Sequence, residues 1–352
     1  MADKKKHKKI TVLIVDDSAL VRQLLTDMIG QDDELEVAGI ARDGVEAIKL
    51  TQELDPDVIT MDIHMPEMDG LQALEYIMKK SPRPVVMLSA LVKQGAAPTL
   101  RALELGAVDF IAKPSQFPTS VSEIREDVLA KIKAAAGSRA REVWERARKA
   151  KAPRKVKPRK EAAGGSLVVM GASAGGPRAL AEVVPALPED LQATMVVVQH
   201  MPEPFTGSFA ERLNSRSRVE VREAEEGEEL VEGRALVVPG GHDMVVERSA
   251  AGRVTARLLP TVARHGASPV IDVTMESAAQ VFGARAVGVL LSGMGSDGAM
   301  GLGMIRDAGG YTIAQNEETC LVFGMPKAAI ERRLVTEILP IDRIAEAIAA
   351  RV

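Results

Sequence analysis

One serine in a glycine-rich stretch is the first residue that could do chemistry. Residues 167–176 read LVVMGASAGG, four apolar residues followed by a glycine-rich run around Ser173. The apolar residues predict a buried strand that ends at Met170, the glycines permit a sharp turn, and Pro177 suits the first turn of a helix. Ser173 is therefore expected in a strand-to-helix turn near the positive end of a helix. A nucleophile is favoured over a phosphate-cradling loop, because Gly-x-Gly-x-x-Gly and a P-loop lysine are both missing.

A nucleophilic serine needs a base, and the base needs an orienting partner. Histidine is the usual base, and two of the five histidines, His200 and His242, follow predicted strands that end at the same sheet edge as Ser173. The residue types leave both open. Asp297, in the segment LLSGMGSDGA, is the candidate orienter. Its loop also offers backbone N–H groups for an oxyanion hole, and the alternative use of this aspartate is to cap the following helix.

A second set of polar residues stands directly after apolar runs in the first third of the chain. It consists of three carboxylates, a hydroxyl and a lysine: Asp16, Asp17, Asp62, Ser89 and Lys113. Clustered carboxylates repel one another unless a cation joins them, and oxygen ligands suit Mg²⁺. A carboxylate beside Mg²⁺ can attack a phosphoryl group, which the hydroxyl and the lysine can then hold. Because all five stand at predicted strand ends, such a site is favoured over ordinary loop polarity.

Parallel sheets are needed to bring these residues together. In the first part of the chain, five apolar runs alternate with amphipathic stretches of helical length. This pattern predicts a doubly wound parallel sheet, whose ligands bind beyond the carboxyl ends of the strands. The runs are 10–15, 37–40, 58–61, 85–88 and 108–112. Ser18 is the expected N-cap of the first helix.

The last part of the chain repeats the α/β pattern, so we expect a second, mainly parallel sheet there. The expected strands are 167–170, 195–198, 235–238, 244–246, 287–291 and 312–314, with a β-hairpin inserted around 244–259. The expected helices are 178–184, 205–214, 273–281, 301–308 and 341–349. Between the two parts lies a segment rich in Arg, Lys and Ala. We therefore expect one domain at 1–137, a basic linker at 138–165 and a second domain at 166–352.

The composition narrows the class of protein and its partners. The chain has 352 residues, of which 46% are hydrophobic and 27% charged, an ordinary balance for two globular domains. A net charge of −4 favours neither a nucleic acid nor a membrane as partner. No apolar run approaches the roughly 20 residues of a membrane span. The single cysteine, Cys320, excludes an internal disulfide and fits a reducing, cytoplasmic compartment.

The first domain resembles the receiver domain of response regulators over residues 9–136, through the ordered motifs VDDS, MDIHMPEMDG, LSA and DFIAKP. The resemblance implies the flavodoxin-like strand order 2-1-3-4-5 and Asp62 as the phospho-acceptor. The matching ligands of Mg²⁺ are Asp16, Asp17, Asp62 and the backbone carbonyl of His64. The matching switch positions are Ser89, Phe110 and Lys113. The phosphodonor that this resemblance implies is a histidine kinase.

The last domain resembles the catalytic domain of the chemotaxis protein-glutamate methylesterases, the CheB family. The ordered motifs are GASAGGP, VVVQHMPEPFTGSFAERLN, PVIDVTMESAA, GVLLSGMGSDGAMGL and TIAQNEETCLVFGMP. The resemblance implies Ser173 as nucleophile, His200 as base, Asp297 as its orienter and the backbone N–H of Met294 in the oxyanion hole. GASAG also fits the G-x-S-x-G elbow of α/β-hydrolases, but that family places the acid before the histidine along the chain. Cys320 is interpreted as a buried small hydrophobe.

Together the resemblances imply a phosphorylation-regulated serine hydrolase of chemotaxis. It would hydrolyse glutamate methyl esters on the cytoplasmic helices of chemoreceptors and also deamidate receptor glutamines, with no cofactor in the catalytic domain and no membrane insertion. The unphosphorylated receiver is expected to restrain the esterase. The alternative is a response regulator whose output domain binds a nucleotide or DNA; the sequence contains no recognisable compact helix-turn-helix, which argues against DNA.

Overall fold

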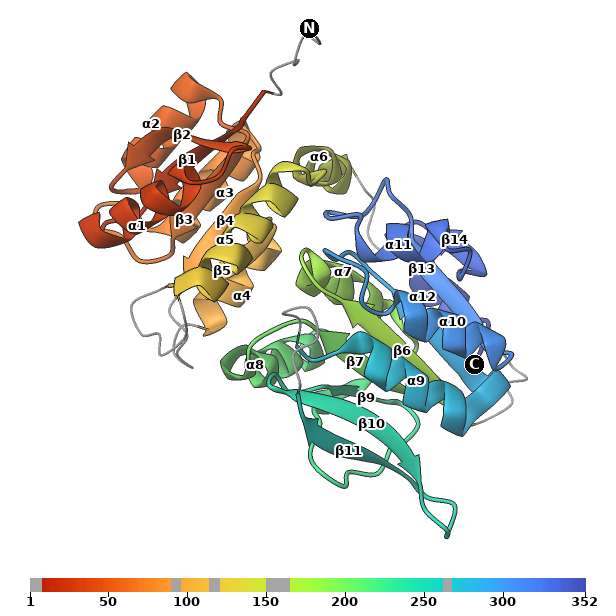
Figure 1. The fold of residues 1–352 in the computed structure, drawn as a ribbon. Helices are drawn as coiled ribbons and strands as arrows, with labels where there is room; N and C mark the ends of the chain where they lie inside the picture. Colours follow the sequence, from red (N-terminus) through yellow and green to blue (C-terminus); the bar gives the residue numbers. More distant parts are fainter. Residues whose placement is uncertain (1–7, 90–95, 114–120, 150–164, 262–267) are drawn as a thin grey trace, which may run out of the picture. The chain divides into compact units, whose positions relative to one another are not determined.

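The computed structural model describes residues 8–89, 96–113, 121–149, 165–261 and 268–352. The chain forms two compact units, which divide between Arg148 and Lys149. Each unit is built on its own parallel sheet (Figure 1), which confirms the predicted fold class. The basic segment 150–164, and with it most of the predicted linker, lies outside the described residues.

The first unit contains a five-stranded sheet in the order β2-β1-β3-β4-β5, and every pair is parallel. This is the order that the receiver resemblance implies. The strands are β1 (Ile10–Val15), β2 (Leu35–Ala41), β3 (Val58–Asp62), β4 (Val85–Ser89) and β5 (Asp109–Ala112). The helices are α1 (Ala19–Gly30), α2 (Gly44–Leu54), α3 (Gly70–Lys80), α4 (Ala96–Leu105), α5 (Val121–Ala136) and α6 (Ala140–Lys149).

Burial on both faces explains the apolar central strands of this unit. All five residues of β3 and of β4 are buried, because α1 and α5 contact each other on one face while α2, α3 and α4 follow one another on the other. Ser18 stands at the N-cap of α1 as predicted, but its side chain makes no capping hydrogen bond. Its backbone N–H instead donates to Asp16 Oδ1 at 2.8 Å.

The second unit contains a seven-stranded parallel sheet in the order β14-β13-β12-β6-β7-β9-β8. Its strands are β6 (Ser166–Ala172), β7 (Ala193–Gln199), β8 (Glu220–Glu223), β9 (Arg234–Val237), β12 (Ala286–Leu290), β13 (Tyr311–Gln315) and β14 (Glu337–Leu339). The strands β10 (His242–Arg248) and β11 (Val254–Pro260) form a separate antiparallel hairpin, which confirms the predicted insertion.

Helices cover both faces of the second sheet (Figure 1). They are α7 (Gly176–Val183), α8 (Glu203–Asn214), α9 (Ile271–Phe282), α10 (Ala299–Asp307), α11 (Met325–Glu331) and α12 (Ile341–Ala349). Helices α9, α10 and α11 follow one another on one face, whereas α7 contacts α8 and α12. On one side of β6 the chain adds β7, β8 and β9, with α7 and α8 in the connections. On the other side it adds β12, β13 and β14, with α9, α10 and α11 in the connections. Because such crossovers are right-handed, the two opposite directions place these two sets of helices on opposite faces of the sheet.

The sequence prediction misses three elements of the second unit, β8, β14 and α11, and ends several of its strands one or two residues too early. β8 reads EVRE and β14 reads EIL, and these short edge strands bury one side chain and none, respectively. They therefore lack the apolar run on which the prediction relied. α11 is a short helix of seven residues. β6 ends at Ala172 and not at Met170, because Gly171 and Ala172 still pair with β7.

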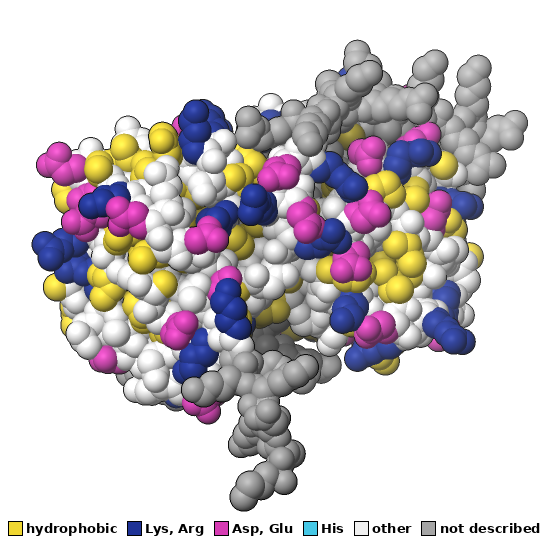
Figure 2. Space-filling model, turned by 90° about the horizontal axis from the view of Figure 1, so that it is seen from above, with side chains coloured by type: hydrophobic (Ala, Val, Ile, Leu, Met, Phe, Trp, Pro, Cys, Tyr) yellow, Lys and Arg dark blue, Asp and Glu magenta, His cyan; other side chains and the backbone are white. Residues whose placement is uncertain are grey.

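Charged side chains of both signs are interspersed over the face shown in Figure 2. This distribution agrees with the composition, which has 45 Lys and Arg against 49 Asp and Glu. Among the described residues, no helix combines the length and the apolar character that a membrane crossing requires.

Candidate active site and acidic cluster

Ser173 lies in a tight turn between β6 and α7. The helix begins at Gly176, two residues before the predicted start at 178, and Pro177 lies in its first turn as predicted. Gly175 has φ 73°, and a Cβ there would lie 2.7 Å from both Ser292 Oγ and Leu321 Cβ, so this position requires glycine. The turn therefore holds the serine at the carboxyl edge of the sheet.

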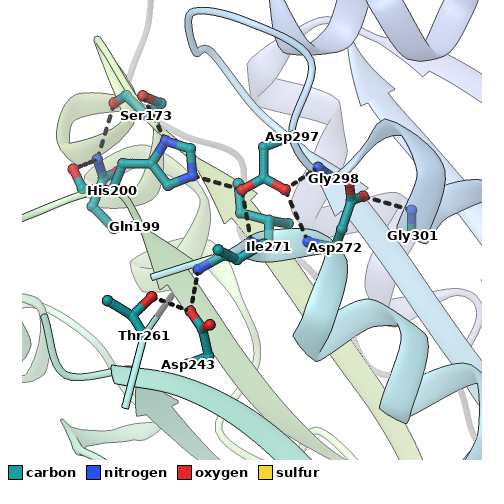
Figure 3. A network of polar contacts seen from close by, with 11 residues as sticks. Ser173, Gln199, His200, Asp243, Thr261, Ile271, Asp272, Asp297, Gly298 and Gly301 are labelled. Carbon is teal, nitrogen blue, oxygen red and sulfur yellow. Dashed lines mark hydrogen bonds and ion pairs between the residues drawn. The ribbon is translucent and has the colours of Figure 1, made fainter. Parts of the chain in front are cut away.

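Ser173, His200 and Asp297 form a continuous hydrogen-bonded chain (Figure 3). His200 Nδ1 is 3.1 Å from Ser173 Oγ, and His200 Nε2 is 2.8 Å from Asp297 Oδ2. The side chains of His200 and Asp297 are only 12% and 15% exposed, so little water competes for these bonds. The three residues follow β6, β7 and β12, which are neighbouring strands. The structure thus brings together the residues that the family resemblance nominates.

The carboxylate of Asp297 accepts hydrogen bonds from more groups than His200. Its Oδ2 also accepts the backbone N–H of Ile271 at 2.8 Å, and its Oδ1 accepts those of Asp272 at 3.0 Å and Gly298 at 2.9 Å. Burial alone would raise the pKa of Asp297, but the hydrogen bonds from His200 and these amides outweigh burial and lower that pKa. Asp297 is therefore ionised at neutral pH, which favours the His200 tautomer with Nε2 protonated and Nδ1 free to accept a proton.

The backbone N–H of Met294 belongs to a loop that passes directly beside Ser173. A Cβ on Gly293 would come within 2.9 Å of Ser173 Cβ, so the backbone of this loop contacts the serine. Over the described ranges, the Met294 N–H has no hydrogen-bond acceptor within the protein. It is therefore free to donate to a substrate oxygen held at Ser173.

Two buried polar side chains also hold the serine turn, and the sequence analysis missed both. Ser292 is 1% exposed, and its hydroxyl donates to the Ala174 carbonyl at 2.8 Å. Gln199 is 2% exposed, and its amide donates to the carbonyls of Ser173 and His200 at 3.0 Å each. The sequence did carry a signal for both: each is a polar residue at the end of a buried strand, close to a residue already predicted to belong to the site.

The second candidate base, His242, is not the histidine that Ser173 contacts, since the Ser173 hydroxyl lies beside His200 Nδ1. His242 opens β10, which pairs with β11 and not with the seven-stranded sheet, and its Nδ1 is 3.4 Å from the Gly240 carbonyl. The structure therefore pairs His200, not His242, with the serine. Cys320 is fully buried, and burial raises the pKa of its thiol, which fits a small core residue and not a nucleophile.

The acidic residues of the first unit converge at one edge of its sheet. One carboxylate oxygen from each of Asp16, Asp17 and Asp62 lies within 4.8 Å of the others. Lys113 Nζ is 3.0 Å from Asp16 Oδ2 and 2.6 Å from Asp62 Oδ2. Asp16 and Asp62 are buried and Asp17 is exposed, so the cluster meets solvent at Asp17.

The charges of this cluster fit a hard divalent cation. Burial raises the pKa of Asp62 and the charge of Asp16 raises it further, although Lys113 and the backbone N–H of His64 oppose the rise. Burial would lower the pKa of Lys113, but its hydrogen bonds to Asp62 and Asp16 outweigh burial and raise that pKa. One ammonium against three carboxylates leaves excess negative charge, which an oxygen-bound divalent ion would neutralise.

The two remaining switch candidates lie on β4 and β5. Ser89 Oγ, at the end of β4, is 2.6 Å from Thr99 Oγ1 on α4. Phe110 on β5 is 5% exposed. Lys131 Nζ on α5 lies 3.1 Å from the Phe110 carbonyl oxygen and 5.7 Å from the centre of its ring. Both candidates therefore connect the strands of the acidic edge to the helices that cover them.

Comparisons with known proteins match both units. The family model "CheB methylesterase" matches residues 168–348, and the model "Response regulator receiver domain" matches residues 12–125. A curated relative from Pyrococcus horikoshii, named "Protein-glutamate methylesterase/protein-glutamine glutaminase", is 48% identical and covers 98% of this chain and 94% of its own. A relative from Carboxydothermus hydrogenoformans, named "Protein-glutamate methylesterase/protein-glutamine glutaminase 2", is 47% identical over 97% and 98%. The crystal structure of the Thermotoga maritima CheB methylesterase catalytic domain is 40% identical with a TM-score of 0.53, over 54% of this chain and 100% of that one.

Proposed function

The chain belongs to the CheB methylesterase family and carries a response regulator receiver domain, and we propose a role for each site residue in this chemotaxis enzyme. The substrate is a glutamate γ-methyl ester on the cytoplasmic helices of a chemoreceptor, and receptor glutamines are a second substrate. The observation that carries the proposal is the hydrogen-bonded chain from Ser173 through His200 to Asp297. The relatives are named as methylesterases, so a nucleotide- or DNA-binding output is not supported.

The first half of the reaction transfers the glutamyl group to the enzyme. Ser173 Oγ attacks the ester carbonyl while His200 Nδ1 takes its proton, since these two atoms are 3.1 Å apart. Asp297 keeps the Nε2 proton of His200 in place and stabilises the imidazolium that forms. The carbonyl oxygen becomes an oxyanion, and the free N–H of Met294 donates to it.

The second half releases the products. His200 gives its proton to the departing methoxide, so methanol leaves and Ser173 carries the glutamyl ester. Water then attacks this acyl-enzyme while His200 takes a proton from the water. The tetrahedral intermediate collapses, Ser173 recovers its proton from His200, and the receptor glutamate is left as a free carboxylate. With a glutamine substrate the same steps release ammonia in place of methanol.

We propose that the acidic cluster accepts the regulatory phosphoryl group. Asp62 is the acceptor, and a histidine kinase of the chemotaxis pathway is the donor. The residues that would hold Mg²⁺ are Asp16, Asp17, Asp62 and the backbone carbonyl of His64. When bound, the ion neutralises charge on the transferred phosphoryl group. Lys113, already 2.6 Å from Asp62, would pair with a phosphoryl oxygen, and Ser89 and Phe110 would respond to it. Because the proposed substrate lies on the cytoplasmic helices of the receptor, we expect the enzyme to act in the cytoplasm.

The test of this function is methanol release from receptor helices that carry labelled methyl esters, with the full chain as enzyme. Wild type should release labelled methanol. Ser173→Ala should release none while keeping the thermal unfolding profile of wild type, because the hydroxyl is removed from a turn whose backbone holds its shape. His200→Ala should be nearly as inactive.

His242→Ala is the matched control, because it removes the other strand-end histidine and should keep wild-type activity. Methanol release that survives in Ser173→Ala would overturn the nucleophile. Activity that is lost in His242→Ala and kept in His200→Ala would overturn the assignment of the base. A wild-type chain that releases no methanol from any methylated receptor would refute the proposed function itself.

A further inference from the structure

Two neighbouring helices of the catalytic unit lack a capping side chain of their own. The N-cap residue of α9 is Val270 and that of α10 is Gly298, and neither forms a side-chain capping bond. The first backbone N–H groups of a helix have no partner within the helix, so another acceptor must satisfy them. Helices α9 and α10 contact each other along the same face of the sheet, which puts such an acceptor within reach.

Each of these helices receives its acceptor from the other (Figure 3). Asp297, which precedes α10, accepts the N–H groups of Ile271 and Asp272 in the first turn of α9. Asp272, in the first turn of α9, accepts the N–H of Gly301 in the first turn of α10 at 2.7 Å. The alternative role predicted for Asp297 is to cap the helix that follows it. Asp297 does cap a helix, but this helix is mainly α9 and not α10, which follows it in the chain.

The exchange depends on a close approach of the two helices. A Cβ at Gly301 would lie 2.5 Å from Met275 Cβ and 3.2 Å from the Asp272 Cα, so glycine is needed there. Burial raises the pKa of Asp272, the Gly301 N–H lowers it, and the nearby charge of Asp297 raises it again. The two carboxylates therefore lie close together: Asp297 accepts two N–H groups of α9, and Asp272 accepts one N–H group of α10.

We propose that Asp272 is a positioning residue of the esterase, which fixes the start of α10 and thereby the hydrogen bond between Asp297 and His200. This inference deepens the proposed function and rests on it. Asp297 stands two residues before α10 and four before Gly301, so a shift of the first turn of α10 moves its carboxylate. Asp272 bonds to Asp297 and Gly301 and not to Ser173 among the described residues, so it acts through Asp297.

Removal of the Asp272 carboxylate should lower kcat and leave KM nearly unchanged. In Asp272→Ala, the Gly301 N–H loses its acceptor and the start of α10 is free to shift. A displacement of about 1 Å in a reacting group can cost about 10²-fold in rate, so kcat should fall by roughly tenfold to a hundredfold. Asp272→Asn keeps an oxygen that can accept from Gly301, so it should restore most of the activity.

The experiment compares three variants of the full chain: Asp272→Ala, Asp272→Asn and the control Asp342→Ala. Asp342 is the matched control, because it is the second residue of α12, as Asp272 is of α9, and it is exposed. The first readout is kcat and KM for methanol release. The second is the low-field proton resonance of the His200 Nε2–H that donates to Asp297, assigned by its loss in His200→Ala. A residue that only stabilises the fold would not move this resonance.

The expected result is a lower kcat and a shifted or broadened resonance in Asp272→Ala, with both restored in Asp272→Asn and untouched in Asp342→Ala. A wild-type kcat in a folded Asp272→Ala overturns the inference, as does an unchanged resonance. If Asp272→Ala does not fold, Asp272→Asn decides alone: the inference requires a retained resonance and near-wild-type kcat, and loss of either overturns it. A wild type that shows the resonance but releases no methanol would instead refute the proposed function.

Discussion

Replacing Asp297 by asparagine tests whether the triad works through the arrangement of donors seen around this carboxylate. Four N–H groups point at its two oxygens: those of Ile271 and His200 at Oδ2, and those of Asp272 and Gly298 at Oδ1. An asparagine offers one oxygen and one NH₂. Whichever way the amide turns, its NH₂ group faces two donors, so a nearly isosteric change produces a direct conflict.

The least costly solution is a change in His200. If the amide oxygen keeps the two backbone donors at Oδ1, the NH₂ faces His200 Nε2, which must give up its proton to accept. The imidazole then carries its proton on Nδ1 and cannot take one from Ser173. In a serine protease this change of tautomer lowers kcat by about 10⁴-fold, which corresponds to about 5.4 kcal/mol of transition-state stabilisation. We expect a loss of similar size here.

Comparing Asp297→Asn with Asp297→Ala separates the effect of the wrong His200 tautomer from the effect of losing the carboxylate charge. Asp297→Ala removes the carboxylate without placing a donor against His200, so the correct tautomer remains accessible. Removal of the acid of a triad costs less than removal of the nucleophile or the base. Because Asp297→Asn also fixes the wrong His200 tautomer, its methanol release should be no higher than that of Asp297→Ala, and both should lie far below wild type. An Asp297→Asn enzyme within about tenfold of wild type, a difference of only about 1.4 kcal/mol, would refute the reasoning.

The same variant carries a stability signature that depends on pH. The pKa of Asp297 in the folded chain is lowered, below its unfolded value of about 3.9. The ionised carboxylate therefore adds stability above that pH, and this contribution is lost as the pH falls through the folded pKa. In urea unfolding, the advantage of wild type over Asp297→Asn should be present at neutral pH and shrink below about pH 4. An advantage that does not change with pH would indicate that charge plays no part.

Two further perturbations test the acidic cluster and the support of the serine turn. Asp62→Asn should take up no phosphoryl label from acetyl phosphate with Mg²⁺ and should keep its basal esterase activity, whereas Ser173→Ala should be labelled normally; label on Asp62→Asn would place the acceptor elsewhere. Ser292→Ala leaves the Ala174 carbonyl and the Val322 N–H without their hydroxyl partner, so the free energy of unfolding in urea should fall by about 1–3 kcal/mol. An unchanged value would mean that water replaces the hydroxyl.

The sequence was sufficient where the relevant signal is local. The apolar runs that become β3, β4, β6 and β7 are buried along their whole length. Beside Ser173, Gly175 is required by its positive φ, and Gly171 and Gly176 by the close approach of neighbouring side chains. The sequence could not decide between His200 and His242, because both follow apolar runs. The sheet decides between them: β9 ends at Val237, and His242 opens a hairpin strand that, among the described residues, pairs only with β11.

The partners of Asp297 were out of reach for a different reason. Ile271 and Asp272 lie 26 and 25 residues before Asp297 in the chain, and a backbone N–H carries no sequence signal. The edge strands β8 and β14 were missed because they bury almost no apolar side chain. In both cases tertiary contacts, and not local pattern, determine the structure.

The order of the strands explains why Asp297 needs the support of a second helix. The sheet runs β12-β6-β7, so the acid and the base follow strands on either side of the strand that carries the serine. The hydrogen-bonded chain, however, places His200 between Ser173 and Asp297. Asp297 must therefore reach across the end of β6, a distance of about two strand spacings of 4.7–4.9 Å each.

The first turn of α9 lies at the end of β6, where the Asp297 side chain reaches across to His200. A Cβ on Gly171, at the end of β6, would come within 2.5 Å of Ile271 Cγ2, so the first turn of α9 covers the end of that strand. Its N–H groups hold the Asp297 carboxylate at this point, and the positive end of the helix favours the negative charge. The acid and the nucleophile follow the adjacent strands β12 and β6, but the acid is held by α9, a helix that follows neither of these strands. Asp272 links α9 to α10, the helix that follows Asp297.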